Sequence, residues 1–64
     1  MPKITLKAAR VNAGLTQEQA AKELGISRST LRNWEIGKSF PKQPDISAMC
    51  ELYKIPFDVL FFGQ

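Results

Sequence analysis

The spacing of apolar residues along the chain predicts a succession of short helices. Apolar positions recur three or four residues apart, which places them on one helical face. The clearest series is Ile46, Met49, Cys50 and Tyr53. No window of four or more residues alternates strictly enough between apolar and polar side chains to suggest a strand. The pattern therefore predicts an all-α fold of five helices.

Capping residues, glycines and prolines mark where these helices begin and end. Thr5 and Ser27 are suited to cap helix N-termini. Thr16 and Gln19 have the spacing of a capping box, in which each side chain bonds the backbone amide of the other. The helices are expected from Thr5 to about Ala13, Thr16 to Leu24, Ser27 to about Ile36, Pro44 or Asp45 onward, and Phe57 to about Phe62.

The second and third predicted helices have the features of a helix-turn-helix. The turn between them is very short and begins with Gly25, which can adopt positive φ. Ala21 is small enough to let two helices cross closely, and apolar anchors lie beneath them. In the third helix Leu31 and Trp34 face inward. The opposite face carries only polar, non-acidic side chains, namely Arg28, Ser29, Arg32 and Asn33.

The positive charge of the chain is concentrated in and after this third helix. Residues 28–42 contain four basic side chains and one acid, Glu35, so this window carries +3, the net charge of all 64 residues. The four basic residues are Arg28, Arg32, Lys38 and Lys42. Elsewhere basic and acidic residues balance. Such a patch is typical of a surface that faces phosphates, although a merely solvated basic face has the same charge.

The stretch from Gln17 to Ile36 resembles the lambdoid phage repressor and Cro family of helix-turn-helix proteins, also called the XRE type. The resemblance covers about residues 4 to 62. The positions that match in register are Gln17, Ala21, Gly25, Leu31 and the Trp34-Glu35-x-Gly37 ending, followed by a loop with a proline and by Ile55-Pro56-Phe57.

The resemblance implies a five-helix DNA-binding domain that spans residues 1–64 and regulates transcription. Its third helix, about residues 28–36, would enter the major groove of a palindromic operator bound by a homodimer. The implied base-reading residues are Arg28, Ser29 and Asn33. Arg32, on the same polar face, is added to them as a candidate; it either lies along the groove wall or has no role. The implied phosphate contacts are Thr16, Gln17, Lys38, Ser39 and Lys42. The family also implies an ion pair between Arg10 and Glu35.

Three positions depart from the family pattern. Ala20 replaces a larger aliphatic residue, so we expect Trp34 to fill the core there. Lys54 replaces a helix-ending glycine, and a left-handed conformation would cost about 1 kcal/mol at this residue. Ile36 replaces a residue that is often polar, which puts one phosphate contact of the family in doubt.

Other classes of protein fit the composition poorly. The chain has no histidine and a single cysteine, Cys50, so an intrachain disulfide is excluded and a metal site is not expected. The usual sets of catalytic acids, bases and nucleophiles are missing, which argues against an enzyme. No stretch approaches the length of a membrane span. We expect a cytoplasmic protein without cofactor or small-molecule ligand.

The C-terminal segment, residues 55–62, carries more apolar side chains than one short helix can bury within its own domain. A homodimer interface is the simplest destination for it, formed by Pro56, Phe57, Phe61 and Phe62. An antitoxin or a protein-interaction module of the same fold is the alternative. Met1 and the polar Gly63-Gln64 end favour a complete small protein over the N-terminal part of a longer repressor. The sequence leaves open which operator is bound and whether the protein represses or activates transcription.

Overall fold

The computed structural model describes residues 3–61, and for Phe61 it describes the backbone alone. Four α-helices account for most of this chain: α1 (Leu6–Asn12), α2 (Gln17–Leu24), α3 (Arg28–Glu35) and α4 (Gln43–Tyr53). A single 3₁₀ turn, η1 (Phe57–Val59), follows α4. Two short strands, β1 (Ile4–Thr5) and β2 (Leu60–Phe61), come before α1 and after η1.

The predicted caps are present at the N-termini of the first three helices. The Thr5 hydroxyl accepts the Ala8 amide at 3.1 Å, and the capping box of Thr16 and Gln19 is formed in both directions. Between α2 and α3, Gly25 has φ 71°, the left-handed conformation that the short turn requires. Each cap binds amides that a helix start leaves without partners, so these boundaries follow from local chemistry.

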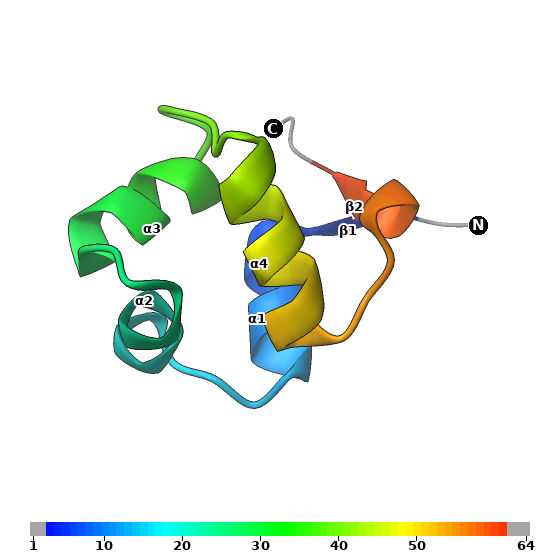
Figure 1. Cartoon of the computed structure of the whole chain (residues 1–64), viewed down its shortest axis with the longest axis horizontal. Helices are drawn as coiled ribbons and strands as arrows, with labels where there is room; N and C mark the ends of the chain where they lie inside the picture. The colour runs from blue at the N-terminus through cyan, green and yellow to red at the C-terminus, as the bar shows by residue number, and fades with distance from the viewer. Residues whose placement is uncertain (1–2, 62–64) are drawn as a thin grey trace.

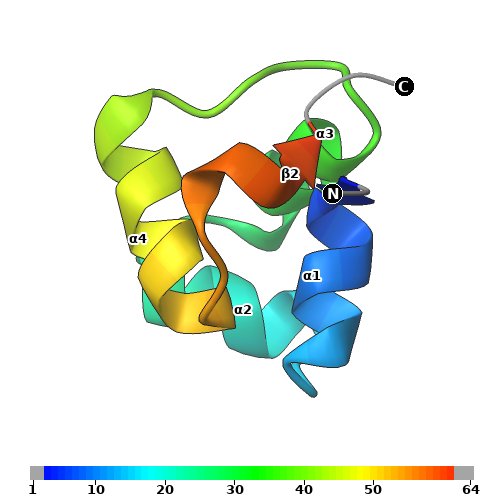
Figure 2. The ribbon, with the colours of Figure 1, turned by 90° about the vertical axis from the view of Figure 1, so that its right-hand side faces the viewer.

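The helices surround one small core. α2 and α3 form one side of the molecule and pack against α1 and α4, while β1 and β2 lie on the far side, as Figures 1 and 2 both show. Trp34, which is 8% exposed, and the fully buried Ala20 both belong to this core. The buried apolar residues are Leu6, Ala9, Ala20, Ala21, Leu31, Trp34, Met49, Tyr53 and Leu60.

The expected fifth helix, from Phe57 to Phe62, is wrong, and so is the expectation that no strand occurs. Its place is taken by η1 and β2 within the described chain, while Phe62 lies outside the described residues. β2 pairs in parallel with β1, Ile4 opposite Leu60 and Thr5 opposite Phe61. A helix this short makes few internal hydrogen bonds. Pairing with a strand gives the backbone partners and leaves Leu60 buried, at 3% exposure.

Lys54 ends α4 in the left-handed conformation, with φ 57° and ψ 48°. Among residues 3–61 it is the one residue other than glycine with positive φ. Its amide donates to the Cys50 carbonyl, which is the bond that a helix-ending glycine would make. The side chain therefore costs the domain about 1 kcal/mol, as the position predicts.

Candidate nucleic-acid interface

α3 is held at its N-terminal end by Ser27. The Ser27 hydroxyl accepts the Thr30 amide at 3.0 Å and lies 2.8 Å from the Thr30 hydroxyl. The first residue of the helix, Arg28, therefore leaves a well-defined end whose free amides carry partial positive charge. This end lies on the side of the molecule away from the two strands (Figure 1).

The two faces of α3 are as different as the sequence predicts. Leu31 and Trp34 are buried in the core. Arg28, Ser29 and Arg32 are exposed, and Asn33 is half-buried. The outward face thus offers donors and acceptors with no acidic group among them.

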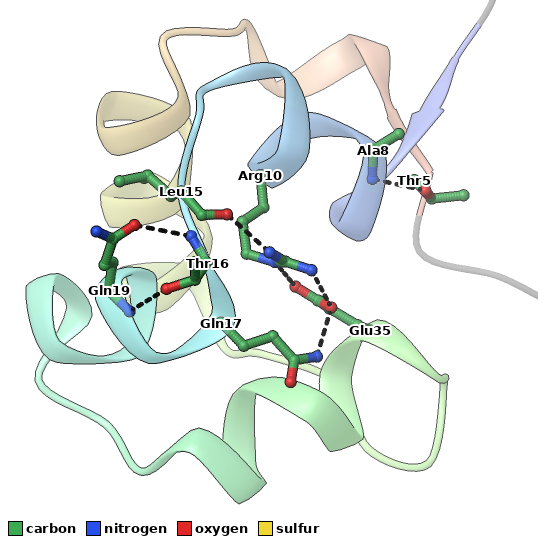
Figure 3. A network of polar contacts seen from close by, with 8 residues as sticks. All are labelled: Thr5, Ala8, Arg10, Leu15, Thr16, Gln17, Gln19 and Glu35. Carbon is green, nitrogen blue, oxygen red and sulfur yellow. Dashed lines mark hydrogen bonds and ion pairs between the residues drawn. The ribbon is translucent and has the colours of Figure 1, made fainter.

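The other end of α3 is fixed by a buried polar network (Figure 3). Arg10 Nε donates to Glu35 Oε2 at 2.7 Å, and Arg10 Nη2 donates to Glu35 Oε1 at 3.4 Å. Arg10 Nη1 donates to the Leu15 carbonyl at 2.7 Å. The side chains of Arg10 and Glu35 are 8% and 2% exposed. The expected pairing of these two residues is therefore buried, and it ties α3 to α1 and to the loop before α2.

This network also sets the charge of the outer surface. Glu35 is the one acid between residues 28 and 42, and its charge is neutralised inside the molecule by Arg10. No other ion pair occurs within residues 3–61. The four exposed cations of this segment consequently form no ion pair within the described residues, although Glu18 lines the same cleft as Arg28. They are Arg28, Arg32, Lys38 and Lys42.

Gln17 joins the network rather than extending from the surface. Its Nε2 donates to Glu35 Oε1 at 2.9 Å, and the side chain is half-buried. The sequence predicts a phosphate contact for Gln17, which stays a prediction; in this structure its side-chain amide donates to Glu35. Because Gln17 lies in the first turn of α2, its backbone amide has no hydrogen-bond partner within the helix.

An open cleft of about 510 Å³ lies where α1 meets the starts of α2 and α3. It brings together Thr16 and Arg28, which the sequence assigned to phosphate and base contacts respectively. Lys7 of α1 was missed, because its place beside α2 and α3 depends on how the helices cross. The lining residues are Lys7, Arg10, Thr16, Gln17, Glu18 and Arg28.

The remaining predicted phosphate contacts lie in the loop between α3 and α4. Lys38, Ser39 and Lys42 are all exposed there, and the loop projects from the molecule at the top of Figure 1. The loop begins where α3 ends, so its cations extend the basic surface beyond the helix. α3 and this loop thus carry all four exposed cations of residues 28–42.

Comparison with known proteins identifies the family to which this domain belongs. The model of a helix-turn-helix family matches residues 6–60, nearly all of the described chain. The chain belongs to this helix-turn-helix family. The resemblance to the XRE type that the sequence carries is thereby confirmed.

Two relatives each match this chain over 59 residues. The HTH-type transcriptional activator BcrR of Enterococcus faecalis is 32% identical over 59 residues, which cover 92% of this chain and 29% of that protein. The type II methyltransferase M1.ScrFI of Lactococcus lactis subsp. cremoris is 36% identical over 59 residues, 86% of this chain and 15% of that protein. The chain thus spans less than a third of either relative. No solved structure matches it significantly.

The residues expected at a dimer interface of the helix-turn-helix domain are only partly described. Pro56 and Phe57 are exposed, Phe57 at 55%. Phe61 belongs to β2 by its backbone, and Phe62 lies outside the described residues. Leu60, in the same segment, is buried within the domain, and Val59 is half-buried. The segment therefore buries part of its apolar surface in its own core.

Tyr53 carries an internal polar group that the sequence did not reveal. The residue is 4% exposed, and its hydroxyl is buried without a hydrogen-bond partner in the described chain. Burial, assisted by the Glu35 carboxylate and opposed by Arg10, raises the pKa of Tyr53 to about 12. The hydroxyl therefore stays neutral at physiological pH and contributes no hydrogen bond to the core.

We expect Tyr53→Phe to stabilise the domain. Removing a buried hydroxyl without a partner avoids its desolvation, which is worth about 1 kcal/mol at pH 7. Above pH 10 the advantage of the variant should grow. Unfolded tyrosine ionises near pH 10, while the folded group holds its proton up to about pH 12. The wild type therefore loses stability between these two values, and the phenylalanine variant does not.

Urea unfolding at pH 7 and at several values between pH 10 and 11.5 measures this difference. The two proteins differ in this one side chain, so the contributions of all shared groups cancel in the comparison. A Phe variant less stable than the wild type at pH 7 would show that the hydroxyl is satisfied in solution.

Other kinds of site find little support in the described chain. Residues 3–61 contain no group of three or more potential ligands that could hold a metal ion. Cys50 is half-buried, and burial raises the pKa of its thiol, which disfavours the reactive thiolate. Within the same residues, no helix combines the length and the apolar character needed to cross a membrane.

Proposed function

We propose that the chain is a sequence-specific, double-stranded DNA-binding regulator of transcription, of the phage repressor and Cro type. One observation carries the proposal, namely the contrast between the two faces of α3. A helix with Leu31 and Trp34 buried presents Arg28, Ser29, Arg32 and Asn33 outward, with no acid among them. These are the side chains that read base edges in the major groove.

The surroundings of α3 support the same proposal. Lys38, Ser39 and Lys42 would hold the sugar-phosphate backbone beyond the C-terminal end of the helix. Beside the N-terminal end of α3, the sugar-phosphate backbone would be held by Thr16, Lys7 and the free amides at the start of α2. The relative BcrR is named an HTH-type transcriptional activator. Whether this domain activates or represses would then depend on where its site lies relative to a promoter.

We further propose that the domain binds a palindromic site as a homodimer. The exposed Pro56 and Phe57, together with Phe61 and Phe62, would form an isologous contact, in which the same patch on each subunit meets its copy. Two recognition helices would then enter successive major grooves about one helical turn apart. Selection of bound duplexes from a random library tests both parts of this proposal. A palindromic consensus supports it, and failure to enrich any sequence would contradict it.

The salt dependence of binding should report the phosphate contacts. If each subunit neutralises about four phosphates, the slope of log K against log salt should be about −7 for a dimer. Lys38→Ala or Lys42→Ala should flatten it by up to about two, for any DNA sequence. Titrations of the wild type and both variants between low and physiological salt measure this. An unchanged slope in both variants would remove these lysines from the interface.

A further inference from the structure

We propose that Phe40 packs against the deoxyribose backbone of bound DNA, on the same face of the loop as Lys42. The inference rests on the proposed DNA-binding function. It assigns a role to an apolar residue that is not among the basic and polar residues proposed above to contact DNA. Its ring would supply a contact that is independent of both base identity and salt.

The loop holds Phe40 outward. The side chain is 60% exposed, although the next residue, Pro41, is buried. A residue before proline is confined to extended backbone conformations. Lys42 is also extended, with φ −87° and ψ 171°. Because successive side chains of an extended segment point to opposite sides, the buried Pro41 leaves Phe40 and Lys42 together on the outer side.

The charges around Phe40 favour a polyanionic partner over a second apolar surface. Lys38 and Lys42 flank it within the loop, both exposed, and the nearest acid before it, Glu35, is neutralised by Arg10. A protein partner would have to cover these ammonium groups in order to reach one ring. The backbone of DNA matches the alternation, because its phosphates attract the lysines and the C–H groups of each sugar offer an apolar surface between them.

A set of matched variants tests the contact. Phe40→Ala removes the ring, Phe40→Leu keeps an apolar side chain, and Val11→Ala truncates a comparably exposed residue, at 56%, on α1. Dissociation constants would be measured on the selected duplex and on random duplex, at several salt concentrations. Hydroxyl-radical footprinting, which attacks deoxyribose, would report the sugars directly.

Phe40→Ala should weaken binding to both duplexes by the same factor, about tenfold per subunit, because the apolar contact is lost. Its salt slope should equal that of the wild type, since no cation is removed. Protection should disappear at a few sugars while the rest of the footprint persists. Phe40→Leu should retain most of the affinity, and Val11→Ala all of it.

Three results would overturn the inference. A dissociation constant of Phe40→Ala within twofold of the wild-type value would show that the ring does not touch DNA. A loss confined to certain base pairs would mean that Phe40 reads or wedges between bases. A change in sedimentation with unaltered footprint would assign the ring to a protein contact. If the wild type itself binds no duplex, the proposed function has failed and the inference falls with it.

Discussion

Arg10→Met should unfold most of the protein at 25 °C. The substitution leaves the Glu35 carboxylate, 2% exposed, without its cation and with the Gln17 amide as its remaining donor. Removing one partner of a buried ion pair costs about 3–5 kcal/mol. A domain of this size has a total stability of about the same magnitude. The effect should therefore exceed that of any substitution on the outer face of α3.

Far-ultraviolet circular dichroism and urea titration measure the loss, with stabilising osmolyte added where the variant is mostly unfolded. Arg32→Met is the matched control, because it makes the same chemical change at an exposed arginine. It should alter stability by no more than about 0.5 kcal/mol. The double variant Arg10→Met/Glu35→Met should recover most of the loss, since both charges are removed together. Equal stability of Arg10→Met and Arg32→Met would show that the pair contributes nothing.

Arg28→Ala should weaken specific DNA binding by about 1–3 kcal/mol per half-site. Arg28 is the first residue of α3, exposed at the end of the helix that would enter the major groove. From there its guanidinium can donate to O6 and N7 of one guanine together. The loss should appear as a flattened preference at that base pair, with neighbouring positions as selective as before.

Arg28→Lys separates base reading from charge. The lysine keeps the positive charge but cannot form the paired bonds to guanine, so the salt slope should persist while the base preference falls. Site selection with wild type, alanine and lysine variants measures both quantities. Thermal unfolding of the variants should match the wild type, because the side chain is exposed. A wild-type consensus with no guanine within about two base pairs of the expected position would assign Arg28 to phosphate.

The parts of this domain that sequence could predict are those decided within a few residues. The cap of Thr16 and Gln19 and the buried pair Leu31 and Trp34 follow from spacing alone, and the structure has both. The left-handed Lys54 is expected from the family resemblance, in which a helix-ending glycine occupies this position.

The parts that sequence missed depend on contacts between distant segments. Leu60 forms a strand because Ile4 lies beside it, and no local pattern records that neighbour. Gln17 turns its amide to Glu35 because α2 and α3 cross at that point. Lys7 reaches the same cleft as Arg28 for a similar reason. The orphaned hydroxyl of Tyr53 required the positions of every surrounding side chain.

The parallel pairing of Ile4 with Leu60 has a consequence for the order of folding. Helical contacts join residues close in sequence and form quickly, whereas this pair closes a loop that spans nearly the whole described chain. We therefore expect the helices to assemble first and the strands to join last. The same strands should open most readily in the native state, and their amides should exchange with solvent before those of the helices. The end of the chain could then detach while the surface around α3 keeps its shape.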